Sequence, residues 1–376
     1  MSLTARQLNR ATLQRQLLLS RAELSVPDAV RHLVGLQAQE AASPYLALWN
    51  RLAGFEAADL DTLFADRGVV KASLMRLTLH AVHIEDYPAL HAVMTPNLRA
   101  SRLHDARFAE SGLTVAEADA LLPGLDEFAL TPRTAGEIEK YLETALGEPR
   151  ERVWWALRTF ARLHHAPTGG PWSFKTGRAS FVAAGGEPSS AEEGLRELVL
   201  RYLGAFGPAS VADVAQFTLL GRPLIRQELA RLGERVRRVE GPGGTELFDL
   251  AGGEVPDEAT PAPARLLGMW DNVLLAYADR ARIIPAEFRP AVIQRNGDVL
   301  PTLLVDGYVA GVWRVVEGGI EATAFRPLSE AEWAGLAVEA AALTAFFSGR
   351  DPALYRRFGH WWVKGLPGVD VRVLPG

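Results

Sequence analysis

The sequence predicts a mostly helical α+β fold, with three tandem winged-helix units followed by a small antiparallel β-barrel-like domain and a closing helix. Two observations predict this fold class. Short helical patterns precede strand-like runs three times in succession, and after a Pro/Gly/acidic linker at 252–264 the apolar periodicity changes from helical to alternating. At 376 residues, the chain is also too long for one ordinary core. The predicted domains are 1–110, 111–188, 189–252 and 265–376.

The clearest unit spans 191–250. Its first stretch, AEEGLRELVLRYLGAFG, has apolar residues at helical spacing and stops at a glycine. Two shorter helical patterns follow: PASVADVAQFTLLG, with Ser210 as its N-cap, and RPLIRQELARLG, with Pro223 near its first turn. The runs ERVRRVE and TELFDL, separated by GPGG, indicate a β-hairpin. Three short helices followed by a hairpin is the order of a winged helix, a variant of the helix-turn-helix module.

The same order of elements occurs twice earlier in the chain. From about residue 113, three helices are predicted by LTVAEADALL, LTPRTAGEIEKYLETAL and ERVWWALRTFARLHH, the last ending at His164 and His165, and GGPWSFKTGRASFVAA predicts a Gly-rich wing. Nearer the N-terminus, helices are predicted by ATLQRQLLLS, PDAVRHLVG and PYLALWNRL, and strands by VVKASLMRLTLHAVH. The repetition is one of pattern and not of sequence identity.

Beyond the linker, short β-rich runs alternate with glycine-containing turns. The runs lie in VLLAYA and AVIQRNGDVLPTLLVDGYVAGVWRVVEGGIEATAF, and the turns lie at 296–297, 306–307 and 318–319. This pattern predicts a small antiparallel sheet or barrel. The stretch SEAEWAGLAVEAAALTAFFSG then predicts the closing helix.

The composition is that of a soluble globular protein, with 48% apolar and 23% charged residues. No apolar run approaches the ~20 residues needed to span a bilayer, and the first residues lack the layout of a signal peptide. We therefore expect a cytoplasmic protein with no membrane partner. The chain has no cysteine, which excludes a disulfide framework and a thiolate metal site.

The overall charge leaves the partner undecided. A net charge of −5 and a pI of about 6.0 do not favour nucleic acid, whose binders are usually basic. However, only four of the 40 basic residues are lysines, and the arginine fork suits phosphates and base edges better than an ammonium does. A GC-rich genome explains most of this bias, so local clusters have to decide the question.

The stretch GLQAQE, beginning at Gly35, holds two glutamines separated by one alanine. Gly35 is a natural stop for the preceding helix and the Ser-Pro pair at 43–44 opens the next one, so 36–40 is predicted to be extended. In extended backbone, side chains two residues apart share a face, so Gln37 and Gln39 would face one cavity. Two carboxamides can hold a water or a nucleobase edge without ionising. The alternative is that they cap the neighbouring helix or lie in solvent.

Few other residues are candidates for catalysis. Glu40 is a candidate general base beside the glutamines, although an acidic residue just before a helix also stabilises the helix dipole. His80 and His83 fall on opposite faces of a predicted strand, so they are poorly placed to share a metal. We expect no metal and no cofactor, because the sequence has no HExxH, P-loop, G-x-G-x-x-G or G-x-S-x-G motif.

Basic side chains gather in two predicted wings and in the stretch YADRAR. Wings and recognition helices are where winged-helix proteins meet phosphates, although charge clusters also occur on plain solvated surface. As a strand, YADRAR would place Arg280 and Arg282 on one face. The predicted DNA contacts are Lys175 and Arg178 in the wing of the second unit, Arg235 and Arg237 around the wing of the third, Arg280, Arg282 and His80.

Several stretches, in order, resemble the AlkZ-like winged-helix DNA glycosylases, the family of the azinomycin-resistance glycosylase. They are VRHLVGLQAQEAASPYLALWNRL, LMRLTLHAVHIEDY, PWSFKTGRASFVAA, RYLGAFGPASVADVAQF, MWDNVLLAYADRARII and PTLLVDGYVAGVWR, and they cover about residues 5–345. The resemblance implies tandem winged helices that form a concave DNA-binding face, and a Gln-x-Gln catalytic motif on Gln37 and Gln39. Relatives with Gln-x-Asp place a carboxylate second, so Gln39 favours the crosslink-directed branch.

The resemblance also implies an activity: a monofunctional DNA repair glycosylase that hydrolyses the N-glycosidic bond of N7-alkylated purines, with N7-guanine interstrand crosslinks as further candidate substrates. An N7-alkylated guanine is cationic and leaves as a neutral base, so two glutamines that position a water suffice. A crosslinked guanine cannot swing out freely, so we expect a shallow, open site. The expected partner is double-stranded DNA carrying alkylated purines, bound by a monomer in the nucleoid region of the cytoplasm.

Two other functions fit the same modules. A non-enzymatic winged-helix transcription regulator would use the arginines on DNA but gives no role to Gln37 and Gln39. A scaffold protein built from these modules fits the net charge of −5.

Overall fold

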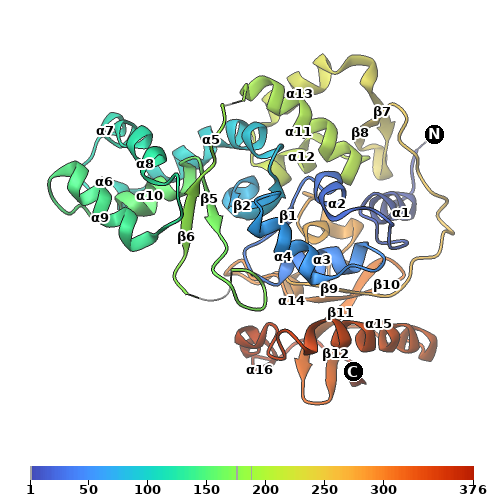
Figure 1. The fold of residues 1–376 in the computed structure, drawn as a ribbon. Helices are drawn as coiled ribbons and strands as arrows, with labels where there is room; N and C mark the ends of the chain where they lie inside the picture. Colours follow the sequence, from blue (N-terminus) through green and yellow to red (C-terminus); the bar gives the residue numbers. More distant parts are fainter. Residues whose placement is uncertain (1, 175–176, 188) are drawn as a thin grey trace.

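The computed structural model describes residues 2–174, 177–187 and 189–376. Figure 1 shows a central body, a helical lobe at one side (106–160) and a long helix along the C-terminal sheet. Within the described ranges, no helix is both long enough and apolar enough to cross a membrane.

The N-terminal region combines five helices with three strands. The helices are α1 (Ala5–Arg15), α2 (Val26–His32), α3 (Ser43–Arg51), α4 (Ala57–Ala65) and α5 (Tyr87–Leu103), and the strands are β1 (Leu36–Gln37), β2 (Val69–Ser73) and β3 (Leu79–His83). Side-chain caps set two of the helix starts. The hydroxyls of Thr4 and Ser25 accept from the backbone N–H groups of Gln7 and Asp28. The first helix therefore begins before the predicted range 11–20, because Thr4 caps it.

The next region forms the lobe and its connecting strands. Its elements are α6 (Ala106–Ala109), α7 (Val115–Ala120), α8 (Leu122–Phe128), β4 (Arg133–Thr134), α9 (Ala135–Leu146), α10 (Val153–Phe160), β5 (Leu163–Ala166) and β6 (Ser180–Ala183). The helix predicted to end at His164 and His165 ends at Phe160 instead, because Ala161 is extended, with φ −60° and ψ 149°. Both histidines lie in β5, where β6 pairs with them.

One six-stranded sheet joins the first two predicted units. Its strand order is β1-β3-β2-β5-β6-β4, and the pairing of Lys71 in β2 with His165 in β5 connects the two halves. The predicted boundary at 110 lies outside the strands, but strands from both sides of it share the sheet. Because β1 is an edge strand, its outer side is available to segments from elsewhere in the chain.

The region 191–250 has the predicted order of elements. They are α11 (Ala191–Phe206), α12 (Val211–Thr218), α13 (Arg222–Arg231), β7 (Val236–Glu240) and β8 (Glu246–Leu250). The Ser210 hydroxyl accepts from the Asp213 N–H over 3.1 Å, as its predicted N-cap role requires. Helix α11 packs on α1 and α5, which attaches this region to the N-terminal one. The division of the chain into three winged-helix units stays a prediction.

The C-terminal region is a covered, open sheet. Its elements are β9 (Arg265–Leu267), α14 (Arg289–Val292), β10 (Thr302–Val305), β11 (Tyr308–Val316), β12 (Gly319–Ala324), α15 (Glu330–Ser348), α16 (His360–Val363) and β13 (Asp370–Pro375). The strand order is β13-β12-β11-β10-β9, so β9 and β13 are edges and the predicted barrel-like closure is not found among the described residues. Helix α15 contacts β9, β12 and β13, and α3 contacts β9. These helices cover apolar surface that a barrel would bury by closing.

Runs predicted as strands between β9 and β10 are helical turns. Within YADRAR, the Asp279 side chain accepts from the Ala281 N–H over 2.9 Å and bends Arg280–Arg282 into a 3₁₀ turn. The prediction that Arg280 and Arg282 share one face of a strand is therefore wrong. The hydrogen bond from the Ala281 N–H to the Asp279 side chain favours a turn here, although the alternating residue pattern favours a strand.

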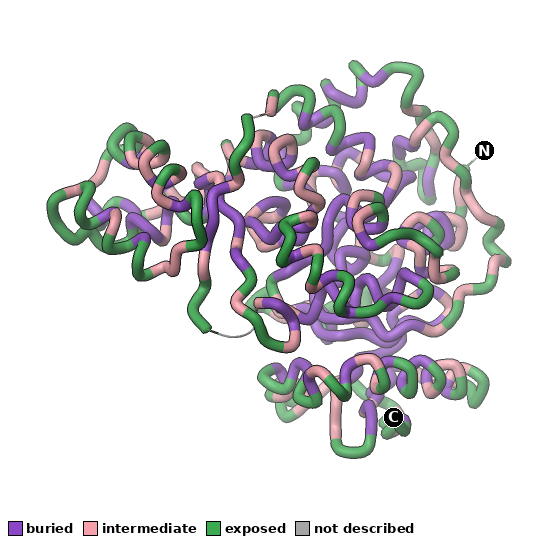
Figure 2. The backbone as a smooth tube through the Cα atoms, in the orientation of Figure 1, coloured by how far each residue is buried: buried purple, intermediate pink, exposed green. Residues whose placement is uncertain are grey.

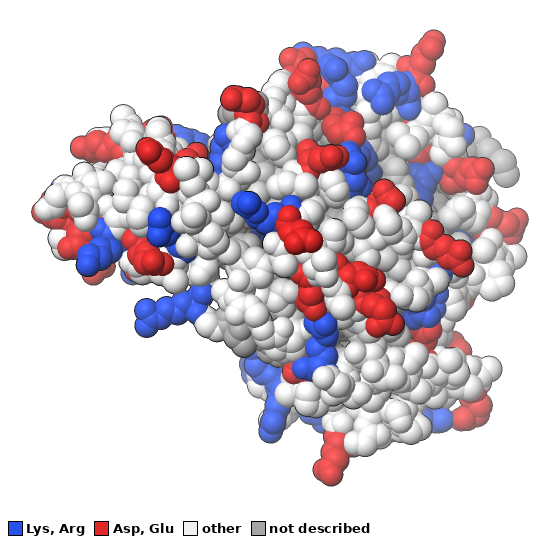
Figure 3. All heavy atoms as spheres, in the orientation of Figure 1, with Lys and Arg blue, Asp and Glu red and all other residues white. Residues whose placement is uncertain are grey.

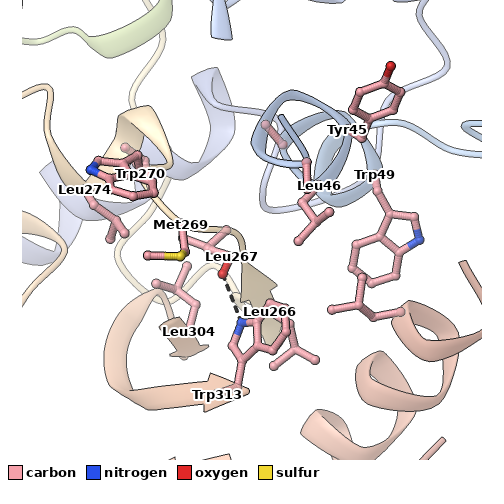
Figure 4. Packing of buried hydrophobic residues seen from close by; sticks show 14 of the residues in the cluster. Tyr45, Leu46, Trp49, Leu266, Leu267, Met269, Trp270, Leu274, Leu304 and Trp313 are labelled. Atoms are coloured by element: carbon pink, nitrogen blue, oxygen red, sulfur yellow. Dashed lines mark hydrogen bonds between the residues drawn. The ribbon is translucent and has the colours of Figure 1, made fainter. Parts of the chain in front are cut away.

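The N-terminal helices and the C-terminal sheet share one core, and Figure 2 shows buried backbone running through the central body. Leu46 and Trp49 of α3 lie against Leu266 and Leu267 of β9 (Figure 4). The fully buried Trp313 of β11 donates its indole N–H to the Leu267 carbonyl oxygen over 2.9 Å. Segments far apart in the chain are thereby held as one packed body.

A buried ion pair crosses the same interface. Arg51 of α3 donates through both Nη atoms to the two carboxylate oxygens of Asp271, each over 2.8 Å, and both side chains are buried. Arg51 also donates to the Ala47 carbonyl oxygen over 3.0 Å and to Gln16 Oε1 over 3.2 Å. This bidentate geometry and the extra acceptors offset the desolvation of the two charges. The pair links α3 to the segment that follows β9.

Asp271→Asn is expected to lower the free energy of unfolding by about 3–5 kcal/mol, because it leaves the Arg51 charge buried without a counter-ion. Urea unfolding followed by circular dichroism measures the change. Glu330→Gln is the matched control, since it removes an exposed partner of Arg372 and should alter stability little. If Asp271→Asn proved as stable as that control, the ion pair would not be what holds the two regions together.

Candidate active site

The two glutamines lie at the end of β1, at the edge of the six-stranded sheet. Gln37 is in register with His80, and the Ala38 N–H donates to the Leu79 carbonyl oxygen over 2.8 Å. The predicted extended backbone is confirmed as far as Ala38, after which the chain bends at Gln39. Ala38 is buried in the core.

Gly35 turns the chain from α2 into β1. Its φ of +110° is one that residues with a side chain rarely adopt, and a Cβ there would lie 2.6 Å from Cγ1 of Val82. Its carbonyl oxygen accepts from Nδ2 of Asn272 over 2.9 Å. Gly35 thus ends the preceding helix region, as predicted, and also anchors the glutamine loop to the C-terminal region.

The two glutamines differ in burial and in contacts. Gln37 is 4% exposed, and its Oε1 accepts from Arg76 Nη2 over 3.3 Å and from Thr78 Oγ1 over 3.2 Å. Gln39 is exposed, and its side chain makes no hydrogen bond with the residues that the structure describes. Gln37 is therefore recessed and held, while Gln39 is open to solvent.

Arg76 is the centre of the polar contacts around Gln37. It lies in the tight turn Met75–Leu77 between β2 and β3, with a φ of +54°. Besides Gln37, its Nη2 lies 2.7 Å from Asn272 Oδ1 and 3.2 Å from His80 Nε2, so its two N–H groups are shared among three acceptors. One guanidinium nitrogen thus joins three segments that are distant in the sequence.

The charge of Arg76 has no carboxylate partner among the described residues. Its guanidinium lies 5.0 Å from the centre of the Phe217 ring. Burial, and then the charge of Arg280, lower the pKa of Arg76 to about 10, which leaves it charged at neutral pH. Burial and the nearby charge of Arg289 also lower the pKa of Arg280. Neither Arg280 nor Arg289 forms an ion pair within the described ranges, so no carboxylate contact balances the charges that act on Arg76 and on Arg280.

His80 supports Arg76 from inside the protein. It is 0% exposed, with Nδ1 3.1 Å from the Thr78 carbonyl oxygen and Nε2 3.2 Å from Arg76 Nη2. Because a guanidinium can only donate, Nε2 accepts and Nδ1 carries the proton, so the ring is neutral. Burial, and then the charge of Arg76, hold the pKa of His80 well below its ordinary value. The predicted contact of His80 with DNA is not supported by this position.

Two other predicted DNA contacts are engaged within the protein. Arg282 donates to the Pro208 carbonyl oxygen over 2.7 Å, and its guanidinium lies 4.2 Å from the centre of the Tyr277 ring. Arg237 donates to Asp249 over 3.2 Å. These contacts give both arginines a structural role.

Among the described residues, neither Arg178 nor Arg235 contacts Arg76 or Gln37. Arg178 and Arg235 are exposed and form no ion pair with described residues, and Lys175 lies outside the described residues. Of the predicted residues that the structure describes, Gln37 and His80 contact Arg76, and the charge of Arg280 acts on it.

Glu40, the candidate general base, is ion-paired with Arg357 of the C-terminal region. This contact turns the carboxylate of Glu40 toward the Arg357 guanidinium, and no hydrogen bond joins it to Gln37 among the described residues. The groups in contact with Gln37 are a hydroxyl and a guanidinium, neither of which can accept a proton at neutral pH. The site can orient a water better than it can deprotonate one.

Sequence reasoning missed Arg76 and Asn272. Arg76 lies 39 residues from its partner Gln37 and 196 residues from its partner Asn272. Arg76 falls in a run that was expected to be strand-like, and no local pattern marks either residue. Their one signal is that both lie in stretches that carry the family resemblance, LMRLTLHAVHIEDY and MWDNVLLAYADRARII.

Comparison with known proteins decides the family. The model of the family described as DNA glycosylase AlkZ-like matches residues 30–346. This chain belongs to the AlkZ-like DNA glycosylases. It is 27% identical over 336 residues to an interstrand DNA cross-link repair glycosylase of Streptomyces sahachiroi, covering 83% of this chain and 88% of that one. The solved structure of the DNA glycosylase AlkZ from the same organism has the same fold, with a TM-score of 0.79 at 24% identity over 92% of this chain and 97% of that one.

The family resemblance predicted from the sequence is thus confirmed, and with it a glycosylase of DNA repair. The matched range includes both glutamines and Arg76.

The neutral state of His80 predicts acid sensitivity. Its folded-state pKa lies below the unfolded value of about 6.5, so the unfolded chain binds the extra proton and stability is lost as the pH falls below about 6.5. As the pH is lowered from 6.5 to 5, the free energy of unfolding should fall more steeply in the wild type than in His80→Gln. Urea unfolding at several pH values measures this, and parallel pH profiles would contradict it.

Proposed function

We propose that this protein hydrolyses the N-glycosidic bond of N7-alkylated purines in double-stranded DNA as a monofunctional glycosylase, with Gln37 and Gln39 positioning the attacking water. The observation that carries the proposal is a pair of non-ionising carboxamides at the end of β1, beside a carboxylate, Glu40, that is already ion-paired with Arg357. Membership of the AlkZ-like DNA glycosylases supports the reaction class.

The chemistry of the leaving group explains why carboxamides suffice. An N7-alkylated purine is cationic, so the C1′–N9 bond breaks with its electron pair going to a base that leaves neutral. The water oxygen bonds to C1′, and the surplus proton passes to solvent. An unmodified purine would leave as an anion and would need an acid, which Gln37 and Gln39 do not supply.

The position of Lys71 supports a monofunctional reaction. Burial lowers the pKa of Lys71 to about 8, so its amine could in principle attack a sugar aldehyde. However, Lys71 is in register with Ala81, and Ala81 with Leu36, whereas Gln37 is in register with His80. Aligned residues share a face of a sheet and successive residues alternate, so Lys71 points to the opposite face from Gln37.

Two observations support interstrand crosslinks as further substrates. The Streptomyces sahachiroi relative is named an interstrand DNA cross-link repair glycosylase. In this chain, Gln39 is exposed at a sheet edge, where a base that cannot swing out of the duplex could still meet it.

Local charge supplies the DNA contacts in this proposal. Figure 3 shows acidic and basic side chains interspersed over one face of the molecule, so no broad field of one sign covers that face. Arg280, whose charge acts on Arg76, and Arg289, whose charge acts on Arg280, have no ion pairs among the described residues, which suits them to hold phosphates near the target nucleotide. Contacts from Lys175, Arg178 and Arg235, a monomeric state and a location in the nucleoid region of the cytoplasm are part of the same proposal.

Gln37→Ala and Gln39→Ala should each slow base release by more than ~10²-fold while DNA affinity is largely kept, because both act on the bound complex. The measurement is single-turnover release of labelled N7-methylguanine from a duplex, with binding followed by fluorescence anisotropy. The product should be an abasic strand that breaks only on heating in alkali.

Each other outcome has a definite meaning. Duplex binding without base release by the wild type would favour a non-enzymatic regulator. No binding even at low salt, where phosphate contacts are strongest, would favour a scaffold. Strand breakage without alkali would contradict the monofunctional reaction.

Arg280→Gln should weaken duplex binding and reduce the slope of log K against log salt by about 0.9, the contribution of one phosphate contact. The control is Arg372→Gln, which removes an arginine whose charge is already balanced by Glu330. Equal salt slopes for the two variants would show that Arg280 does not contact a DNA phosphate. Titrations of an undamaged duplex at several salt concentrations suffice for the comparison.

A further inference from the structure

We propose that Arg76 is a positioning residue that fixes the carboxamide of Gln37, so that Gln37 acts toward the substrate only as a hydrogen-bond donor and Gln39 is left as the acceptor for the attacking water. This inference rests on the proposed function. It assigns different roles to the two glutamines, although their side chains are chemically identical.

The contacts of Gln37 determine which way its amide points. A guanidinium has no acceptor, so the atom of Gln37 that faces Arg76 Nη2 at 3.3 Å has to be the oxygen. Thr78 Oγ1 lies 3.2 Å from the same oxygen and shares its one proton between that oxygen and the Met75 carbonyl oxygen at 3.1 Å, so Oε1 faces two donor groups of the protein. Nε2 has no hydrogen-bond partner among the described residues, nor is it one of the enclosed, unpaired atoms. The two N–H groups are what Gln37 can offer to a ligand.

The residues around Arg76 agree with this orientation. Asn272 accepts from Arg76 through Oδ1 and donates through Nδ2 to the Gly35 carbonyl oxygen, so its amide also has one consistent orientation. His80 can only accept at Nε2, as its neutral tautomer requires. Arg76 therefore sits among neutral acceptors that hold it in place without cancelling its charge.

Arg76 is an unfavourable choice for stability alone. Its Nη1 is enclosed without a hydrogen-bond partner, its charge has no carboxylate partner among the described residues, and its φ of +54° is strained. An apolar side chain of similar length would avoid the unpaired charge. A group that is retained at such a cost to stability points to a role in the site, and its contact with Gln37 identifies that role.

The division of work follows from hydrogen-bond polarity. A water that attacks C1′ needs an acceptor for one of its protons, so that a lone pair points at the carbon. Gln37 is poorly placed to be that acceptor, because Oε1 is turned toward Arg76 and Thr78, but its amide N–H groups can donate to the water oxygen or to an acceptor atom of the nucleotide. Gln39, whose side chain is exposed and unbonded within the described ranges, has its carbonyl oxygen available.

Isosteric acids distinguish the two glutamines. Gln37→Glu removes both donors and places a carboxylate beside Arg76, so release of N7-methylguanine from a duplex should fall by ~10²-fold or more. Gln39→Glu keeps an acceptor and should lose less than ~10-fold. Equal losses in the two variants would overturn the division of work. A wild type that released no base would instead overturn the proposed function itself.

Arg76→Met tests the positioning role. It should slow single-turnover release by at least ~10-fold at unchanged duplex affinity, while its midpoint of urea unfolding stays equal or rises. Arg76→Lys, which keeps a charged donor, should recover part of the rate. In a Gln37→Ala background, Arg76→Met should have little further effect, because its target is gone. A lowered unfolding midpoint without a rate loss, or the same rate loss in both backgrounds, would show that Arg76 does not act through Gln37.

Discussion

The buried ion pair between Arg51 and Asp271 is the constraint on which the site depends. It ties helix α3, which follows the glutamine loop, to the segment after β9. The next residue, Asn272, holds the Gly35 carbonyl oxygen on one side and the Arg76 guanidinium on the other. The buried ion pair therefore holds the helix after the glutamine loop, and through Asn272 it also fixes the start of the loop at Gly35 and the side chain of Arg76. An isolated loop of this sequence would have no reason to keep that geometry.

Charge is distributed unevenly between scaffold and site. Many arginines of this chain form ion pairs with carboxylates, as Arg51 does with Asp271. These arginines stabilise the fold and add little to the electrostatic potential outside the protein. Around Gln37 the rule is reversed, since Arg76 and Arg280 have no carboxylate partners within the described ranges. The candidate site thus combines cations with non-ionising amides, and its nearby carboxylate, Glu40, is ion-paired with Arg357. Such a site suits the proposed substrate, a nucleotide that is held by its phosphates and has a base that is already cationic.

Much of the fold follows from local signals that the sequence displays. The Ser210 cap and the hairpin after α13 were predicted because side-chain hydrogen bonds and turn residues act over a few positions. Where the prediction failed, an interaction that the apolar pattern does not show decided the structure. His164 lies in a strand and YADRAR forms a turn because sheet pairing with β6 and the Asp279 side chain overrode periodicity. The predicted barrel became an open sheet because α15 and α3, elements outside the strand pattern, cover it.

The sequence alone is enough to point to the candidate site, because a glycine stop and a Ser-Pro start bracket the short stretch that carries Gln37 and Gln39. Tertiary structure decided what each glutamine can do. Gln37 is held as a donor because its oxygen faces Arg76, 39 residues away in the sequence, and Arg76 is in turn bonded to Asn272, 196 residues farther along. Gln39 has no such partner among the described residues and is left open. The sequence shows which side chains are present. Whether an amide acts as donor or acceptor depends on the group beside it, and tertiary packing brings that group from a distant part of the chain.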